Sequence, residues 1–188
     1  RNLYGLNYAR TTREKYMLVC EGYLDVISMH QAGFTNAVAS LGTAFTSQHA
    51  GVLKRYTDQV ILTYDSDGAG IKAALRAIPI LRDAGISARV LNMKPYKDPD
   101  EFIKNMGADA FKERIAQAKN SFLFEIDVLK RNYQLEDPEQ KTKFYQETAK
   151  KLLQFGEPLE RDNYIQAVSR EQMIKEEELR QLVNRLGM

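Results

Sequence analysis

The sequence predicts an α/β fold, in which a mainly parallel four-stranded sheet is flanked by helices and followed by a C-terminal helical bundle. Over about the first 118 residues, short apolar runs alternate with helix-length segments, which is typical of parallel strands joined by right-handed crossovers. From residue 119 onward, the apolar residues recur at helical spacing. We therefore divide the chain into an α/β unit, residues 1–118, and a helical unit, residues 119–188.

The predicted strands are short and apolar, and helical segments separate them. We expect strands at residues 16–21, 36–40, 60–64 and 86–93. We expect helices at residues 23–32, 46–56 and 70–84, a short one ending near residue 106, and one at 108–119. Gly33, Gly85 and Gly107 follow three of these segments directly, and glycine is common immediately after a helix end.

The C-terminal region shows the apolar stripes of amphipathic helices. One stripe passes through Phe122, Leu123, Ile126, Leu129 and Tyr133. A second, after the break at Asp137-Pro138, passes through Phe144, Thr148, Leu152 and Phe155. Residues 161–168 and 176–186 are also expected to be helical, so this region is interpreted as a small bundle.

Composition excludes several classes of protein. The 188 residues are 44% hydrophobic, which is enough for one good core. The single cysteine, Cys20, excludes a disulfide framework, and its apolar surroundings predict a buried, unreactive thiol. No long apolar run or signal peptide is found, so we expect a cytoplasmic protein without a membrane partner. The net charge of +2 is too small to indicate nucleic-acid binding, and His30 and His49 are expected at the surface.

Two aspartates follow the third predicted strand directly. Asp65 and Asp67 stand one residue apart, so their carboxylates lie on the same side of an extended segment. Such a pair is costly unless a cation lies between the charges, and a hard divalent cation is a common solution. The alternative from the same residues is a turn aspartate followed by a helix N-cap.

Further carboxylates follow two other predicted strands. Glu21 ends the first strand, and Asp98 and Asp100 come after the fourth. Because the C-terminal ends of parallel strands meet at one edge of a sheet, we expect these acids near Asp65 and Asp67. Oxygen ligands without His or Cys select Mg²⁺ or Mn²⁺ over Zn²⁺. The sequence therefore predicts a Mg²⁺ site used in phosphoryl or nucleotidyl transfer.

Several of these acids have a structural alternative. Asp25 lies one helical turn after Glu21, so it either joins the metal site or stabilises a helix N-terminus. Asp98 precedes a proline and is suited to cap a helix, with Asp100 in its first turn.

Three small or basic residues are candidates for contacts with a nucleotide or nucleic acid. Gly42 and Thr43 follow the second strand, where a backbone contact to a ligand is possible. Lys72 falls in the first turns of the helix after Asp67, either near incoming phosphates or simply solvated. The glycines at 68 and 70 lack the spacing of a P-loop, so close packing of helix on strand is the favoured interpretation.

Four segments together resemble the Toprim catalytic core of bacterial DnaG-type DNA primases. They are EGYLDV at 21–26, ASLGT at 39–43, DSDGAGIKAA at 65–74 and DPD at 98–100, and LYGL at 3–6 resembles the segment that leads into that core. The resemblance is close over residues 1–118 and looser over the helical unit. It implies a Toprim-type sheet and the DNA-templated synthesis of short RNA primers from NTPs during replication.

The resemblance also implies roles for individual residues. Glu21, Asp65 and Asp67 match acids that hold Mg²⁺ in catalysis, Asp98 and Asp100 complete or border the metal site, and Asp25 lies close by. The implied partners are a single-stranded DNA template, the RNA primer and a replicative helicase. We expect the helicase to bind through a region outside this chain, and zinc to occur only in a preceding N-terminal domain.

Two other functions use the same features. A Toprim nuclease or topoisomerase would cut DNA with the same metal-bound acids, and a non-catalytic docking module would use the helical unit alone. Because the chain begins with Arg rather than Met, we interpret it as a fragment of a longer protein. Alone, it is expected to bind Mg²⁺ but to make primers weakly or not at all.

Overall fold

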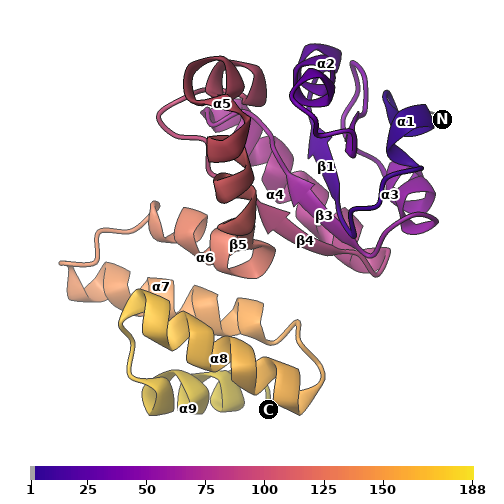
Figure 1. The fold of residues 1–188 in the computed structure, drawn as a ribbon. Helices are drawn as coiled ribbons and strands as arrows, with labels where there is room; N and C mark the ends of the chain where they lie inside the picture. The colour runs from indigo at the N-terminus through magenta and orange to yellow at the C-terminus, as the bar shows by residue number, and fades with distance from the viewer. Residues whose placement is uncertain (1–2) are drawn as a thin grey trace. The chain divides into compact units, whose positions relative to one another are not determined.

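The computed structural model describes residues 3–188 and consists of two compact units, residues 1–121 and 122–188. Figure 1 shows the helices and strands of each. The division at 118 and 119 remains our proposal for the domain boundary and falls three residues before the point at which the units separate. Among the helices of the described residues, none is long and apolar enough to cross a membrane.

The first unit is built on a five-stranded sheet. Its strands are β1 (Met17–Cys20), β2 (Ala37–Ala39), β3 (Gln59–Leu62), β4 (Ser87–Val90) and β5 (Lys119–Asn120), in the order β2-β1-β3-β4-β5. The four predicted strands are confirmed, and they pair in parallel. The fifth was missed: β5 pairs antiparallel with β4 but has only two residues, too few to show a periodic pattern.

Five helices accompany this sheet. They are α1 (Leu6–Ala9), α2 (Tyr23–Gln31), α3 (Ser47–Lys54), α4 (Gly68–Asp83) and α5 (Pro99–Ala116). The four-residue α1 was not predicted. Near it, Tyr4 forms an isolated bridge with Ala39 at the end of β2. The predicted break at Gly107 is confirmed, since this residue interrupts α5 with φ 86° and ψ 170°.

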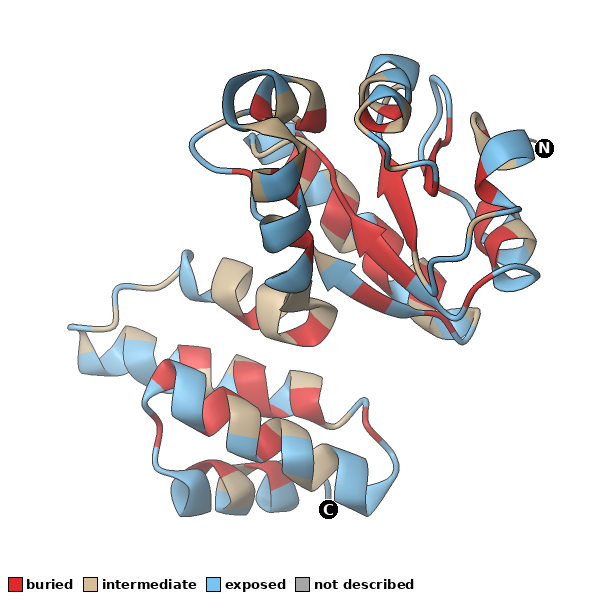
Figure 2. Ribbon diagram, in the orientation of Figure 1, coloured by how far each residue is buried: buried red, intermediate tan, exposed pale blue. Residues whose placement is uncertain are grey.

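The sheet is buried between helices. Side chains alternate along β1, and Leu18 and Cys20 join a core that includes Phe102 and Phe111 of α5 and residues of α2. Figure 2 accordingly shows β1 and β2 buried and β3 largely buried, whereas β4 and β5 are only partly buried. Burial also raises the pKa of the Cys20 thiol, which fits the predicted unreactive core cysteine.

His49 differs from its predicted surface position. It is buried, and its Nδ1 accepts a hydrogen bond from the backbone N–H of Thr46 at 3.0 Å. Thr46 in turn caps α3 by accepting the backbone N–H of His49 at 3.2 Å. The pair forms a capping box, so the ring is held inside by its role at the helix start.

The second unit is helical, as predicted. It contains α6 (Ser121–Lys130), α7 (Pro138–Leu152), α8 (Pro158–Gln172) and α9 (Glu176–Leu186). Phe122, Ile126, Phe144 and Leu152 from the two predicted stripes lie in one buried cluster. Within that cluster the rings of Phe155 and Tyr164 stack with centroids 3.9 Å apart.

Candidate functional site

The first two predicted site residues meet because β1 and β3 are adjacent strands. Val19 pairs with Leu62, and the ladder extends to a hydrogen bond from the Thr63 N–H to the Val19 carbonyl at 2.8 Å. Two residues further along each strand, the Asp65 N–H donates to Glu21 Oε1 at 2.9 Å. The chain leaves β1 toward β2 on one side and β3 continues toward β4 on the other, so these acids lie where strand order reverses.

Asp67 lies at the start of α4 and caps it. Its Oδ1 accepts the Gly70 N–H at 2.8 Å, which confirms the capping alternative that the sequence left open. A Cβ on Gly70 would come within 1.9 Å of the Asp65 carbonyl oxygen, so only glycine allows this helix to approach the strand end so closely. One carboxylate oxygen of Asp67 thus serves the helix, and Oδ2 remains available for another ligand.

The third acidic segment is fastened to the same edge of the sheet by the loop before α5. Ser66 donates its N–H to the Lys97 carbonyl at 2.8 Å and its hydroxyl to the Tyr96 carbonyl at 3.1 Å. Asp98 then caps α5 by accepting the Glu101 N–H at 2.8 Å. The loop therefore carries the carboxylate of Asp98 toward the segment that holds Asp65.

Asp100 is engaged in a different way. Its Oδ2 forms an ion pair with Lys104 at 3.0 Å, and its carboxylate also accepts a hydrogen bond from Ser28. These contacts, the Lys104 hydrogen bond above all, hold its pKa below the ordinary value. Asp100 therefore already has its charge balanced within the protein, unlike Asp65.

Like charges gather around Asp65 and Asp25. The pKa of Asp65 is raised to about 6, by burial and then by the charges of Glu21, Asp98 and Asp67, with Lys97 acting in the opposite direction. The pKa of Asp25 is raised to about 7, first by burial and next by Asp98. Asp65 thus feels the charges of Glu21, Asp67 and Asp98, and Asp25 feels those of Asp98, Asp65 and Asp100; the charge of Lys97 does not offset the rise in the pKa of Asp65.

This donor set fits a hard cation. It offers carboxylate oxygens alone, and the raised pKa values show repulsion that a divalent ion would relieve. In residues 3–188, however, no three such side chains stand close enough to hold a metal ion as they are placed. Asp67 and Asp98 each use one carboxylate oxygen to cap a helix. A metal ion would therefore bind their second oxygens together with the carboxylates of Glu21 and Asp65.

A cavity of about 410 Å³ opens beside Glu21. The predicted contact residues Gly42 and Thr43 line it, together with Tyr64 and Arg76. Lys72, also predicted, is exposed and does not line it. The structure thus brings two of the three predicted contact residues to Glu21, and it places Arg76, which sequence reasoning missed, where Lys72 was expected.

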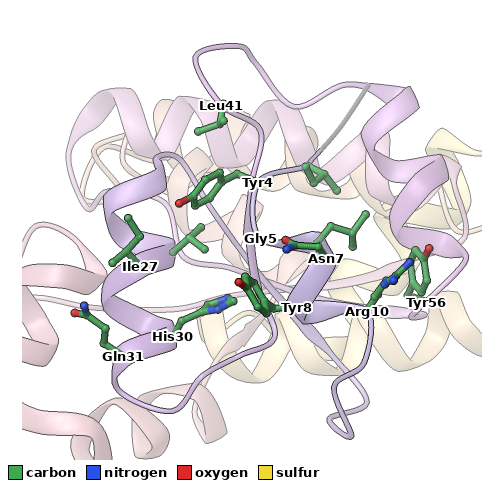
Figure 3. Close-up of a pocket in the computed structure, with 13 residues that line it drawn as sticks. Tyr4, Gly5, Asn7, Tyr8, Arg10, Ile27, His30, Gln31, Leu41 and Tyr56 are labelled. Carbon is green, nitrogen blue, oxygen red and sulfur yellow. The ribbon is translucent and has the colours of Figure 1, made fainter.

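A second cavity, of about 770 Å³, lies away from the acids. Figure 3 shows it between the N-terminal segment, α2 and the exposed ring of Tyr56. Tyr8 and His30 meet edge to face on its wall, with ring centroids 6.0 Å apart. Its lining is mainly aromatic and aliphatic, and none of the predicted metal-binding acids belongs to it.

Comparison with known proteins covers both units. The chain matches the Toprim-like family over residues 18–103 and the DnaB-helicase binding domain of primase over residues 122–177. The DNA primase of Clostridium acetobutylicum is 38% identical over 97% of this chain and 31% of its own length. A solved DNA primase domain from Pseudomonas aeruginosa has a TM-score of 0.76 and 32% identity, over 98% of this chain and 59% of that one.

The chain belongs to the DnaG-type primase family. The E. coli primase catalytic core has a TM-score of 0.74 at 32% identity, over 90% of this chain and 56% of that one. A DnaG primase catalytic domain solved with bound single-stranded DNA has a TM-score of 0.77 at 30% identity, over 95% of this chain and 58% of that one. Nearly all of this chain aligns with these curated primases, but it spans only about a third of their length.

The match to the helicase-binding domain of primases lies within this chain. The sequence predicted a helicase contact through a region outside this chain, whereas the match to the helicase-binding domain covers residues 122–177 of it. The match begins at the first residue of the second unit.

Proposed function

We propose that this chain is the metal-binding catalytic part of a primase, a nucleotidyltransferase that makes short RNA primers on a DNA template. The observation that supports this most strongly is the contact between Glu21 and Asp65 at the reversal of strand order, surrounded by Asp67, Asp98 and Asp25. Membership of the DnaG-type family supplies the reaction.

Each acid has a part in this proposal. Glu21, Asp65 and Asp67 hold Mg²⁺, or Mn²⁺ in its place, with Asp98 beside them. A bound ion would supply Lewis-acid chemistry, lowering the pKa of the attacking 3′-hydroxyl and offsetting charge on the pyrophosphate leaving group. Asp25 lies close to these acids, and burial and the charge of Asp98 raise its pKa to about 7 in the metal-free protein. Asp100, paired with Lys104, orients the loop rather than binding the ion.

The partners follow from the same family. The template is single-stranded DNA, as in the solved DnaG complex, and the substrates are NTPs and the growing RNA primer. We place the replicative helicase contact on the helical unit, which matches the DnaB-helicase binding domain of primases. Because the curated relatives are about three times longer, full primer synthesis requires their remaining regions as well.

A chimeric enzyme tests the proposal. Residues 1–188 would replace the matching segment of the Clostridium acetobutylicum primase, and primer synthesis would be measured on single-stranded DNA with NTPs and Mg²⁺. We expect an active chimera that Glu21→Gln and Asp65→Asn inactivate, whereas the matched surface change Glu14→Gln leaves activity intact. An active chimera that is indifferent to Glu21→Gln and Asp65→Asn would contradict the catalytic assignment. Cleavage of the template without synthesis would favour the nuclease alternative.

A further inference from the structure

The 410 Å³ cavity beside Glu21 has a polar end and an apolar wall. Glu21, Thr43, Tyr64 and Arg76 contribute its polar groups. Its apolar wall is formed by Phe45, Ala73, Ala77 and Ile80. Its volume lies in the range of pockets that bind small molecules, and a few placed polar groups over an apolar wall are the usual lining of such pockets.

Helix geometry delivers Arg76 to this cavity. Ala73, Arg76, Ala77 and Ile80 are spaced as i, i+3, i+4 and i+7, so they share one face of α4. Lys72, one turn before Arg76, does not line the cavity, although it lies nearer in sequence to the acidic motif.

Within the described residues, the Arg76 side chain has no ion-pair partner. It is exposed, and it forms no ion pair or hydrogen bond with any other residue in the range 3–188. Arg76 lines the same cavity as Tyr64, and its positive charge opposes the rise that burial causes in the pKa of the Tyr64 hydroxyl. A guanidinium presents a planar array of N–H donors that suits the oxygens of a phosphate.

Glu21, which belongs to the proposed metal site, lines the same cavity. A cation held by Glu21 and Asp65 also attracts phosphate oxygens, since Mg²⁺ usually shares its coordination sphere with a substrate phosphate. The exposed loop at Gly42 completes the rim, and reciprocal hydrogen bonds between Ser40 and Thr43, at 3.1 and 3.2 Å, hold this loop in shape. A phosphate in this cavity would thus meet the positive charge of the guanidinium and that of the bound ion.

We propose that this cavity is a nucleotide subsite in which Arg76 binds a phosphate group and the apolar wall of α4 receives the sugar or base. The proposal rests on the proposed function, because it assumes a metal ion at Glu21 and Asp65. The shared chemistry is a phosphate with an attached nucleoside, which belongs either to a free NTP or to the end of a polynucleotide. Arg76 is therefore a positioning residue for the nucleotide.

Binding measurements on the 188-residue chain distinguish these sources. One arm titrates N-methylanthraniloyl-ATP and a second titrates a fluorescein-labelled deoxythymidine decamer, both with Mn²⁺ and followed by fluorescence anisotropy. Arg76→Ala removes one charged hydrogen-bonding partner, so it should lower the affinity for the probe that contacts this side chain by about tenfold or more. Arg76→Lys, which keeps the charge but not the fork of donors, should fall in between. Arg55→Ala, an exposed arginine that lines none of the described cavities, is the matched control.

A Mn²⁺ titration without nucleotide separates this proposal from the metal site itself. We expect Arg76→Ala to bind Mn²⁺ like the wild type, since the guanidinium is not a ligand. Unchanged affinity of Arg76→Ala for both probes, or no binding of either probe by the wild type, would overturn the nucleotide subsite while Mn²⁺ binding still stood. A wild-type chain that does not bind Mn²⁺ would overturn the proposed function instead.

Discussion

Replacing Asp25 with asparagine should stabilise the metal-free protein at neutral pH. The folded protein raises the pKa of this carboxyl from 3.8 to about 7, so ionising it in the folded state is unfavourable. A shift of about three units corresponds to about 4 kcal/mol at 1.36 kcal/mol per unit. Because the side chain is partly exposed, solvent screening reduces this, and we expect about 2 kcal/mol.

The sign of the pH dependence follows from which state binds the proton more tightly. The pKa of Asp25 is higher in the folded state, so the stability of the wild type falls as pH rises from about 4 to about 7. The asparagine side chain of the variant carries no such proton, yet its amide oxygen can still accept the Asp100 backbone N–H. The advantage of Asp25→Asn should therefore be small near pH 4, grow through this interval and level off above pH 7.

Hydrogen exchange gives the stability of the α/β unit separately from the helical unit. The exchange of β1 and β3 amides would be followed in chelator between pH 4 and 8, with intrinsic rates corrected for pH. Asp109→Asn, an exposed acid on α5, is the matched control and should change stability by less than about 0.5 kcal/mol. An Asp25→Asn variant that is less stable than the wild type at pH 8, or equally stabilised at every pH, would refute the electrostatic reasoning.

Three further predictions follow from the geometry. Gly70→Ala should destabilise the α/β unit by about 3 kcal/mol or more in thermal melts, because its Cβ would collide with the Asp65 carbonyl, whereas Gly68→Ala meets nothing within 4 Å and should be tolerated. Asp67→Asn should keep the cap of α4 and the melting temperature but lower the Mn²⁺ affinity about tenfold or more. An unchanged Mn²⁺ affinity would show that Asp67 only caps the helix. Asp100→Asn should change Mn²⁺ affinity less than about threefold, since Lys104 already pairs with this acid, and a loss as large as that of Asp65→Asn would show that Asp100 is a ligand.

The sequence predicted the sheet edge well because its signals are local and strong. The apolar run before Asp65 and the one before Glu21 each specify a strand, and parallel pairing places their ends together. The loop of Asp98 was expected there for the same reason. What the pattern could not decide was whether Asp67 and Asp98 cap helices, because capping and metal binding use the same oxygens.

Other features depend on three-dimensional packing. The strand β5 and the helix α1 are too short to leave a periodic signal. Arg76 was missed because proximity in sequence favoured Lys72, and only the lining of the cavity beside Glu21 distinguishes them. His49 could have been found, since Thr46 three residues earlier has the spacing of a capping box.

Mn²⁺ binding to the wild-type chain and to Asp65→Asn is the most direct test of the metal site. Asparagine keeps the shape of the side chain and removes the charge that meets Glu21, Asp98 and Asp67. We predict saturable binding by the wild type near pH 7.5, weakening as pH falls below about 6 because protons then compete at Asp65. Asp65→Asn should bind at least about tenfold more weakly. Identical isotherms for the two proteins would contradict a metal site at this edge of the sheet.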